Sequence, residues 1–131
     1  MILADTNVLS ELVRPRPDPK VLAWAESQPL LAVSVVTVEE IAFGFALRPN
    51  SVVEARLMTL IGQNCEVLPV DSAIARRSGE LRGRFAAAGQ ARMQADMLIA
   101  ATAHLHRLVL ATRNTKDFTG CGIRVMSPFG R

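Results

Sequence analysis

The chain has 131 residues, half of them hydrophobic and 21% charged, which predicts a single globular domain over residues 1–131. Only 5% of the residues are aromatic, so we do not expect a platform on which single-stranded bases stack. No apolar run approaches the roughly 20 residues that cross a bilayer, and an acid at position 5 interrupts the N-terminal apolar run. We therefore expect a cytoplasmic protein with no signal peptide and no membrane partner. The two cysteines have no CxxC spacing, which is typical of reduced thiols and leaves too few ligands for zinc.

Basic residues exceed acidic ones by 15 to 12. If four acids gather in one site, 8 acids remain to face the 15 basic residues over the rest of the surface. A surface of that kind attracts polyanions such as nucleic acids. An ordinary, mildly basic enzyme surface is the alternative.

Short apolar runs bounded by turn residues predict strands, and apolar residues at helical spacing predict helices. The predicted strands cover residues 1–4, 30–36, 67–70, 108–111 and 123–126. The predicted helices cover residues 8–13, 19–27, 37–47, 52–62, 73–87 and 93–106. Thr37 and Glu40 form a capping-box pattern that predicts the start of the third helix. This alternation predicts an α/β fold with three layers, α/β/α, around a mostly parallel central sheet.

Acidic residues follow the ends of several predicted strands, where parallel sheets form their binding sites. Asp5 ends the first strand, Glu40 lies one helical turn past the second, and Asp117 follows a later one. A fourth acid, Asp96, interrupts an otherwise apolar helix, where an unpaired buried carboxylate is strongly unfavourable. Two alternatives stay open at this point: Asp96 points to solvent, and Asp5 simply caps the next helix.

Carboxylates that converge on one point repel each other, and divalent cations commonly neutralise them. Ligands made only of oxygen favour hard cations such as Mg²⁺ or Mn²⁺. Such ions activate water and stabilise the charge that grows on a phosphoryl group. Acids near the edge of a parallel sheet, together with a basic surface, therefore indicate phosphodiester hydrolysis.

Four segments resemble, in order, the motifs of PIN-domain nucleases of the VapC and FitB type. They read ILADTNVLS (residues 2–10), SVVTVEEI (34–41), DMLIAATA (96–103) and LATRNTKDF (110–118). Each segment alone is weak evidence for the family, but the order and spacing of all four, in a chain of this length, make the resemblance specific. It spans nearly the whole chain and implies a PIN-like fold.

The resemblance implies a role for each matching residue. The catalytic, metal-binding residues would be Asp5, Glu40 and Asp96. The fourth metal position is Asn114 or Asp117, because some relatives carry an acid at the first place and others carry it three residues later. The supporting residues would be Thr6, Asn7 and Thr112. Glu39 is expected in solvent, since adjacent helix positions point about 100° apart. Apart from the resemblance, the basic side chains that could steer RNA by charge are Arg84, Arg92 and Arg113.

The resemblance further implies a metal-dependent endoribonuclease that is the toxin component of a toxin–antitoxin module. Its cofactor would be Mg²⁺ or Mn²⁺, and its products would carry a 5′-phosphate and a 3′-hydroxyl. The implied partners are an RNA substrate, a cognate antitoxin protein and a second copy of the chain in a homodimer. DNA would be contacted only through the antitoxin. The predicted helices over residues 21–27 and 37–47 are the candidate surfaces for the antitoxin or the second copy.

Two other classes of protein compete with this interpretation. A haloacid-dehalogenase-like phosphatase opens with Asp-x-Asp after the first strand, but here the third residue is Asn7, and 131 residues leave no room for the usual cap domain. The other rival is a catalytically weak PIN-like binding module that acts in a DNA-binding repressor complex with its antitoxin. Metal-dependent cleavage of RNA separates the nuclease from both.

Overall fold

The computed structural model describes residues 1–130, which form a central sheet of five strands. The strands are β1 (Ile2–Ala4), β2 (Leu31–Ser34), β3 (Cys65–Leu68), β4 (Val109–Ala111) and β5 (Val125–Met126). Their order is β3-β2-β1-β4-β5 and every neighbouring pair is parallel, so the predicted parallel sheet is confirmed. The first strand is central, because Leu3 is in register with Ala32 on one side and with Leu110 on the other.

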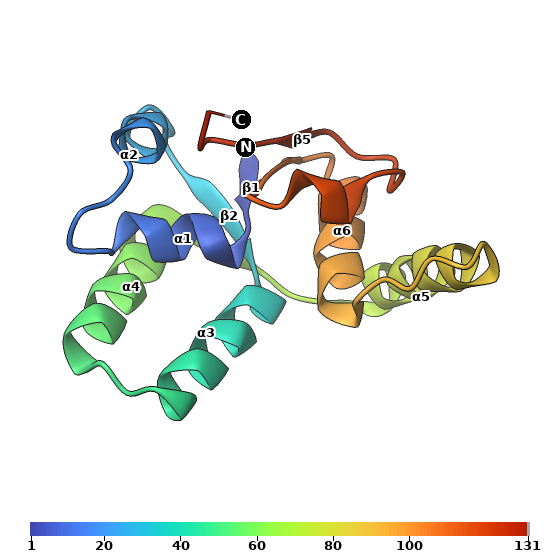
Figure 1. Ribbon diagram of the computed structural model, residues 1–131, viewed down its shortest axis with the longest axis horizontal. Helices are drawn as coiled ribbons and strands as arrows, with labels where there is room; N and C mark the ends of the chain where they lie inside the picture. The colour runs from blue at the N-terminus through green and yellow to red at the C-terminus, as the bar shows by residue number, and fades with distance from the viewer. Residues whose placement is uncertain (131) are drawn as a thin grey trace.

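Helices cover both faces of this sheet. They are α1 (Thr6–Leu12), α2 (Pro19–Glu26), α3 (Val35–Leu47), α4 (Ser51–Asn64), α5 (Ser72–Ala87) and α6 (Gln94–His106), with a short 3-10 helix η1 (Thr115–Phe118). Figure 1 shows α1, α2 and α4 to one side of β1 and β2, and α5 and α6 to the other. The predicted three-layer α/β/α architecture is therefore confirmed.

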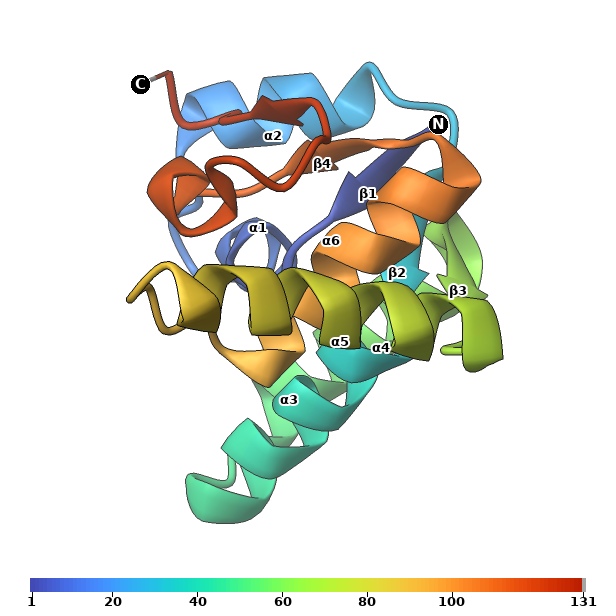
Figure 2. The same ribbon diagram turned by 90° about the vertical axis from the view of Figure 1, so that its right-hand side faces the viewer.

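Each face of the sheet has its own apolar core. On one face, side chains from α1, α2 and α4 pack on the sheet; they include Val8, Leu9, Val21, Leu57 and Ile61. On the other face, side chains from α5 and α6 pack on β1 and β4; they include Leu81, Met97, Ile99, Ala100 and Ala103. In Figure 2, α5 crosses in front of α6, which lies between α5 and the sheet.

Capping residues explain where several helices begin. Asp5, Asp18 and Asp71 cap α1, α2 and α5, because each carboxylate accepts a backbone N–H from the first turn. Pro19 occupies the first position of α2, as predicted. Gly89, with φ of 77°, follows the end of α5 at the predicted stop.

The junction between β2 and α3 differs from the prediction. The strand ends at Ser34 instead of residue 36, and α3 begins at Val35. Ser34 is the cap, because its Oγ accepts the Val36 N–H at 3.0 Å. The predicted capping box is therefore wrong: Thr37 is fully buried inside the helix, and Glu40 faces another part of the molecule.

The edge strand β3 begins and ends two residues earlier than predicted, and Pro69 directly follows it. Its only partner strand in the sheet of residues 1–130 is β2, as expected for an edge. Cys65 and Cys121 are both free thiols. None of the helices within residues 1–130 combines the length and the apolar content that a bilayer span requires.

Candidate active site

The strand order reverses direction between β1 and β4, which are neighbours in the sheet although far apart in sequence. The helices that follow β1 and β2 pack on one face, whereas α5 and α6 cover the other face before the chain enters β4. Binding sites in parallel sheets form beyond the carboxyl ends of the strands at such a switch point. Asp5 directly follows β1 and Thr112 directly follows β4, so both residues lie at this position.

Asp5 is held in one orientation by neutral donors. The residue is only 6% exposed. Its Oδ1 accepts the Thr6 N–H at 2.8 Å, and its Oδ2 accepts the Thr112 hydroxyl at 2.8 Å. The Asn7 side-chain amide donates to Oδ2 at 3.3 Å. Because none of these donors carries a positive charge, the carboxylate is oriented but not neutralised.

The same network joins α1 to the loop that follows β4. The Asn7 Oδ1 accepts the Arg113 N–H at 3.0 Å, and the Thr112 Oγ1 accepts the Asn114 N–H at 3.1 Å. Asn7 and Thr112 therefore bind Asp5 and also fix the loop that carries Asn114.

Glu40 reaches the same point from α3. Its Oε1 accepts the Thr6 hydroxyl at 2.8 Å, so Thr6 binds Asp5 through its backbone and Glu40 through its side chain. Burial raises the pKa of the Glu40 carboxyl above its usual value, and the charges of Asp5 and Glu39 raise it further against the hydrogen bond from Thr6. Glu39 itself is exposed, as predicted.

Asp96 lies in the first turn of α6 and is half-buried. Burial raises the pKa of its carboxyl to about 6, and the negative charges of Asp5, Asp117 and Glu40 act in the same direction. The Arg92 guanidinium acts in the opposite direction, but it does not cancel them. Asp96 therefore faces the other acids and does not point away into open solvent.

These side chains border one cleft of about 460 Å³. The predicted site residues around it are Asp5, Thr6, Asn7, Glu40, Asp96, Arg113 and Asn114. Asp117 is exposed and borders a neighbouring hollow instead. The structure thus brings three predicted acids and Asn114 together, and it places Asp117 just outside the cleft.

The chemistry of this donor set fits a hard divalent cation. Three carboxylates and one amide border the cleft. Burial and then repulsion from the other acids raise the pKa of Asp96, and a nearby cation would oppose both effects. Within residues 1–130, no three Asp, Glu, His or Cys side chains are close enough to hold an ion in their present positions.

The arginines that sequence analysis assigned to RNA lie in different surroundings. Arg113 borders the cleft. Arg92 fastens the chain around η1, because its Nη1 donates to the Asp117 carbonyl at 2.9 Å and its Nη2 donates to the Thr119 carbonyl at 2.8 Å. Arg84 is exposed in the last turn of α5 and does not border the cleft.

Glu11 is a buried acid that sequence analysis missed. It is 3% exposed, and its Oε1 accepts hydrogen bonds from Arg14 Nη1 at 2.8 Å and from Arg113 Nη2 at 3.1 Å. Its Oε2 accepts the Asp18 N–H at 2.8 Å. Burial raises the pKa of Glu11, but the Asp18 N–H and the two guanidinium groups outweigh it and hold the pKa below its usual value. Its position three residues after Val8, on the apolar stripe of α1, was the available signal.

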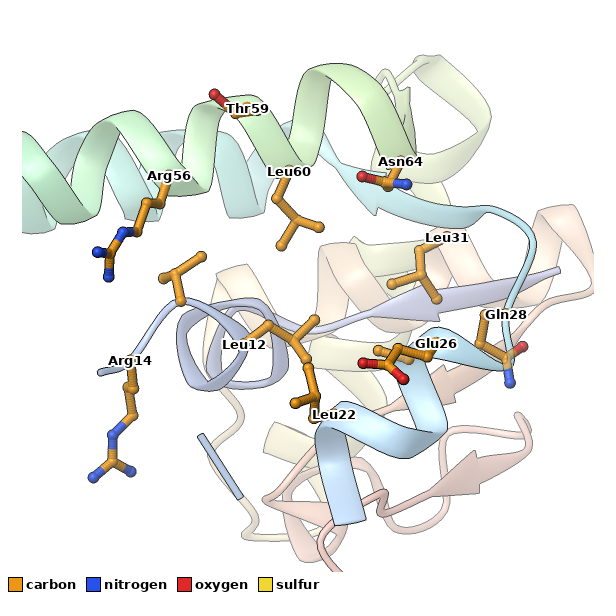
Figure 3. Close-up of a pocket in the computed structure, with 12 residues that line it drawn as sticks. Leu12, Arg14, Leu22, Glu26, Gln28, Leu31, Arg56, Thr59, Leu60 and Asn64 are labelled. Carbon is orange, nitrogen blue, oxygen red and sulfur yellow. The ribbon is translucent and has the colours of Figure 1, made fainter. Parts of the chain in front are cut away.

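A second cavity, of about 500 Å³, lies between α1, α2 and α4. Figure 3 shows Leu12, Leu22, Leu31 and Leu60 around this space, with Arg14 at one edge. None of the predicted acids lines the cavity. Its apolar wall can receive an apolar side chain, and among residues 1–130 Glu26 is the one acidic residue in its lining, so no group of carboxylates gathers there.

Comparisons with known proteins match most or all of the chain. The family model of the PIN domain matches residues 2–119. VapC ribonuclease Y4jK of Sinorhizobium fredii is 36% identical to the chain over 98% of both sequences. The crystal structure of FitAcB from Neisseria gonorrhoeae superposes with a TM-score of 0.85 at 35% identity and covers 100% of both chains. A toxin-antitoxin complex from Klebsiella pneumoniae contains a chain that is 32% identical, with a TM-score of 0.77 and 98% of both chains covered.

Proposed function

The chain belongs to the PIN-domain family, and from this premise we propose that it is the ribonuclease toxin of a toxin–antitoxin module and needs a divalent cation. Residues 1–131 act as one nuclease unit in this proposal. The similarity to a VapC ribonuclease and to a chain of a toxin-antitoxin complex supports the toxin role. The observation that carries the catalytic part is the gathering of Asp5, Glu40 and Asp96 around one cleft at the switch point of the sheet.

In this proposal the cation is Mg²⁺ or Mn²⁺, held by Asp5, Glu40 and Asp96, with the Asn114 amide oxygen beside them. When bound, such a cation lowers the pKa of a water molecule and stabilises negative charge on the reacting phosphate. Asp117 is the alternative fourth residue, and its charge already acts on Asp96 from outside the cleft.

The chain itself contributes orientation. Because three donors bind the buried Asp5 carboxylate, it cannot rotate away from the cleft. Thr6 ties the position of Glu40 to that of Asp5. These groups are oriented when the protein folds, before RNA binds. The reaction step therefore does not carry the entropic cost of orienting them.

The proposed partners are RNA, a cognate antitoxin through which DNA is contacted, and a second copy of the chain. The helices named as partner surfaces both carry exposed apolar side chains. Leu22 on α2 is 38% exposed, and Phe43 and Leu47 on α3 are 64% and 65% exposed. Figure 2 shows α3 extending away from the layers that enclose the sheet, where a partner can reach it. The proposed location is the cytoplasm, where RNA substrates are found.

The test is RNA cleavage by purified, antitoxin-free protein in Mn²⁺, Mg²⁺ or EDTA. We expect cleavage that requires a metal ion and leaves 5′-phosphate ends. Asp5→Asn and Asp96→Asn should each lower the rate more than about 100-fold, the upper value for losing a group that merely orients a metal ligand. The matched control is Glu39→Gln, which removes an exposed acid beside Glu40 and should cleave like the parent protein.

One outcome would replace this proposal with its rival. If several pools of RNA stay intact in every metal, while the protein is folded and still binds its antitoxin, the nuclease proposal is wrong. The binding module that acts within a repressor complex would then be the better description.

A further inference from the structure

The cleft has a basic side as well as an acidic one. Arg14 and Arg113 border it together with the acids, and both guanidinium groups donate to the same oxygen of the buried Glu11 carboxylate. The other oxygen of Glu11 is occupied by a backbone N–H, so the carboxylate cannot turn. A buried anchor therefore holds two long cationic side chains on one side of the cleft.

We propose that Arg14 and Arg113, fixed by Glu11, form a phosphate clamp that binds the RNA backbone beside the carboxylates. This inference rests on the proposed function and adds the group by which the substrate is held. Within it, Glu11 is a positioning residue, because it acts on the substrate only through the two arginines.

Each guanidinium keeps most of its donors for a ligand. A guanidinium carries five N–H donors, and only one nitrogen of each arginine is bonded to Glu11. The side chains of Arg14 and Arg113 are 60% and 47% exposed, so the remaining donors are open to solvent. One carboxylate cannot neutralise two cations, which leaves a net positive charge at the rim. The planar fork of arginine matches the oxygens of a phosphate.

Arg113 is fixed at three points. Its backbone N–H donates to Asn7, its Nη2 donates to Glu11, and its guanidinium carbon lies 4.2 Å from the centroid of the Phe129 ring. Ordering a long, flexible side chain has a cost in conformational entropy. Here that cost falls on folding, so RNA does not have to meet it on binding. Asn7 also binds Asp5, so the position of the clamp is tied to that of the first proposed metal ligand.

Arg113 also stands between two hollows. One is the cleft, and the other is a neighbouring hollow of about 640 Å³ whose lining includes Lys116 and Ser127. An RNA strand that continues from the cleft into this hollow has to cross Arg113. Beyond Arg113, the second hollow offers the strand Lys116, with Asp117 next to it.

The test measures binding without cleavage. An Asp96→Asn protein in EDTA is titrated into fluorescent single-stranded RNA of mixed sequence over a series of salt concentrations. On this background, Arg14→Gln and Arg113→Gln should each weaken binding about 10-fold, as expected for lost charged hydrogen bonds. Each should also lower the slope of log K against log salt by about 0.7, the value for one phosphate contact on a single strand.

The matched control is Arg124→Gln. Arg124 is exposed and directly precedes β5, so it lies toward the amino ends of the parallel strands, away from the cleft. The Arg124→Gln substitution removes the same charge from the protein and should leave the slope of log K against log salt unchanged. Arg113→Lys keeps the charge without the fork, and it should recover the slope but only part of the affinity.

Glu11→Gln separates positioning from charge, and it is assayed for cleavage on the otherwise unchanged protein with metal. Loss of a negative charge favours RNA binding, whereas arginines that RNA itself has to order disfavour it, so kcat is the readout. It should fall about 10-fold or more, because the arginines no longer hold the phosphate in place beside the acids. Unchanged kcat and KM would show that Glu11 is only structural. Thermal unfolding of each variant sets an assay temperature at which all are folded.

The clamp is wrong if Arg14→Gln and Arg113→Gln bind RNA with the affinity and salt slope of the Arg124→Gln control. That result is distinct from failure of the proposed function, which would appear as absence of cleavage by the parent protein in every metal. A parent that cleaves RNA beside arginine variants that bind normally would overturn the clamp alone.

Discussion

Two carboxylates at opposite ends of α1 are almost equally buried but are satisfied in different ways. Asp5, the N-cap, is 6% exposed and accepts hydrogen bonds only from neutral groups. Glu11, in the last turn, is 3% exposed and binds two guanidinium groups and a backbone N–H. Around Glu11 the bonded partners outweigh burial and lower its pKa, whereas burial and the acids near Asp5 raise the pKa of Asp96 to about 6.

The difference separates an acid that folding has already neutralised from acids that still lack a cation. Burying a carboxylate without a positive partner is costly, so such a group is retained where a ligand supplies the charge. The cations that bind Glu11 are Arg14 and Arg113 of the same chain, so Glu11 stabilises one side of the cleft. Asp5, Glu40 and Asp96 are the acids left for a cation from solution.

Removing one charge at each end of α1 tests whether the two carboxylates differ in this way. Glu11→Gln should lower the free energy of unfolding by about 2 kcal/mol, as is typical for hydrogen bonds to charged groups. Asp5→Asn should lower it by less, because Asn caps a helix about as well as Asp and the relief of repulsion among the acids offsets the hydrogen bonds that its NH2 group cannot accept. Denaturant unfolding of the metal-free protein measures both, and equal losses would contradict the distinction.

A second experiment asks whether the donors that orient Asp5 serve activity. Thr112→Val keeps the shape of the side chain but removes the 2.8 Å hydrogen bond to Asp5. We expect RNA cleavage to fall roughly 10–100-fold, as for other groups that orient a metal ligand. Thr102→Val is the matched control, because Thr102 is also fully buried and its hydroxyl donates to the Leu98 carbonyl within α6. Similar losses of activity in the two variants would remove the special role of Thr112.

A third experiment measures the pH dependence of stability without metal. The pKa of the Asp96 carboxyl is about 6 in the folded protein and 3.8 in the absence of its surroundings. Between these values the folded protein binds more protons than the unfolded chain, so stability falls as the pH rises from about 4 to about 6. In EDTA the Tm should decline across this window, and Mg²⁺ or Mn²⁺ at pH 7 should raise it again.

Other carboxyl groups titrate in the same window, so this measurement needs its own control. Glu40 acts in the same direction because its pKa is also raised, whereas Glu11, whose pKa is lowered from 4.5, acts in the opposite direction at lower pH. The difference between the parent protein and Asp96→Asn isolates the contribution of Asp96. If that difference in stability does not change between pH 4 and pH 6, burial and the nearby acids do not raise the pKa of Asp96.

Much of the fold was predictable because the strands are short apolar runs between clear helical segments. The positions of Asp5 and Glu40 after the first two strands, and of Asp96 in an apolar helix, were predictable from the same patterns and from the family motifs. The start of α3 was not, because Ser34 and Thr37 are both good capping residues and only the packing of the helix decides between them.

The roles of Glu11 and Arg92 depend on partners that are distant in sequence. Glu11 binds Arg113, which is 102 residues away, and Arg92 binds the carbonyl of Asp117, which is 25 residues away. A local pattern shows the first as one polar residue in a short helix and the second as a basic surface residue. Only the folded chain shows that both hold other parts of the molecule in place.

The bond between Asp5 and Thr112 spans 107 residues, and it has a consequence for synthesis of the protein. The strand β1 sits between β2 and β4, yet β4 is translated long after it. At about 5–20 residues per second, a ribosome needs roughly 5–20 seconds to travel from one partner of this bond to the other. A growing chain therefore has no complete cleft until β4 and the loop after it have emerged from the ribosome, so the segments that are made first cannot act on RNA by themselves.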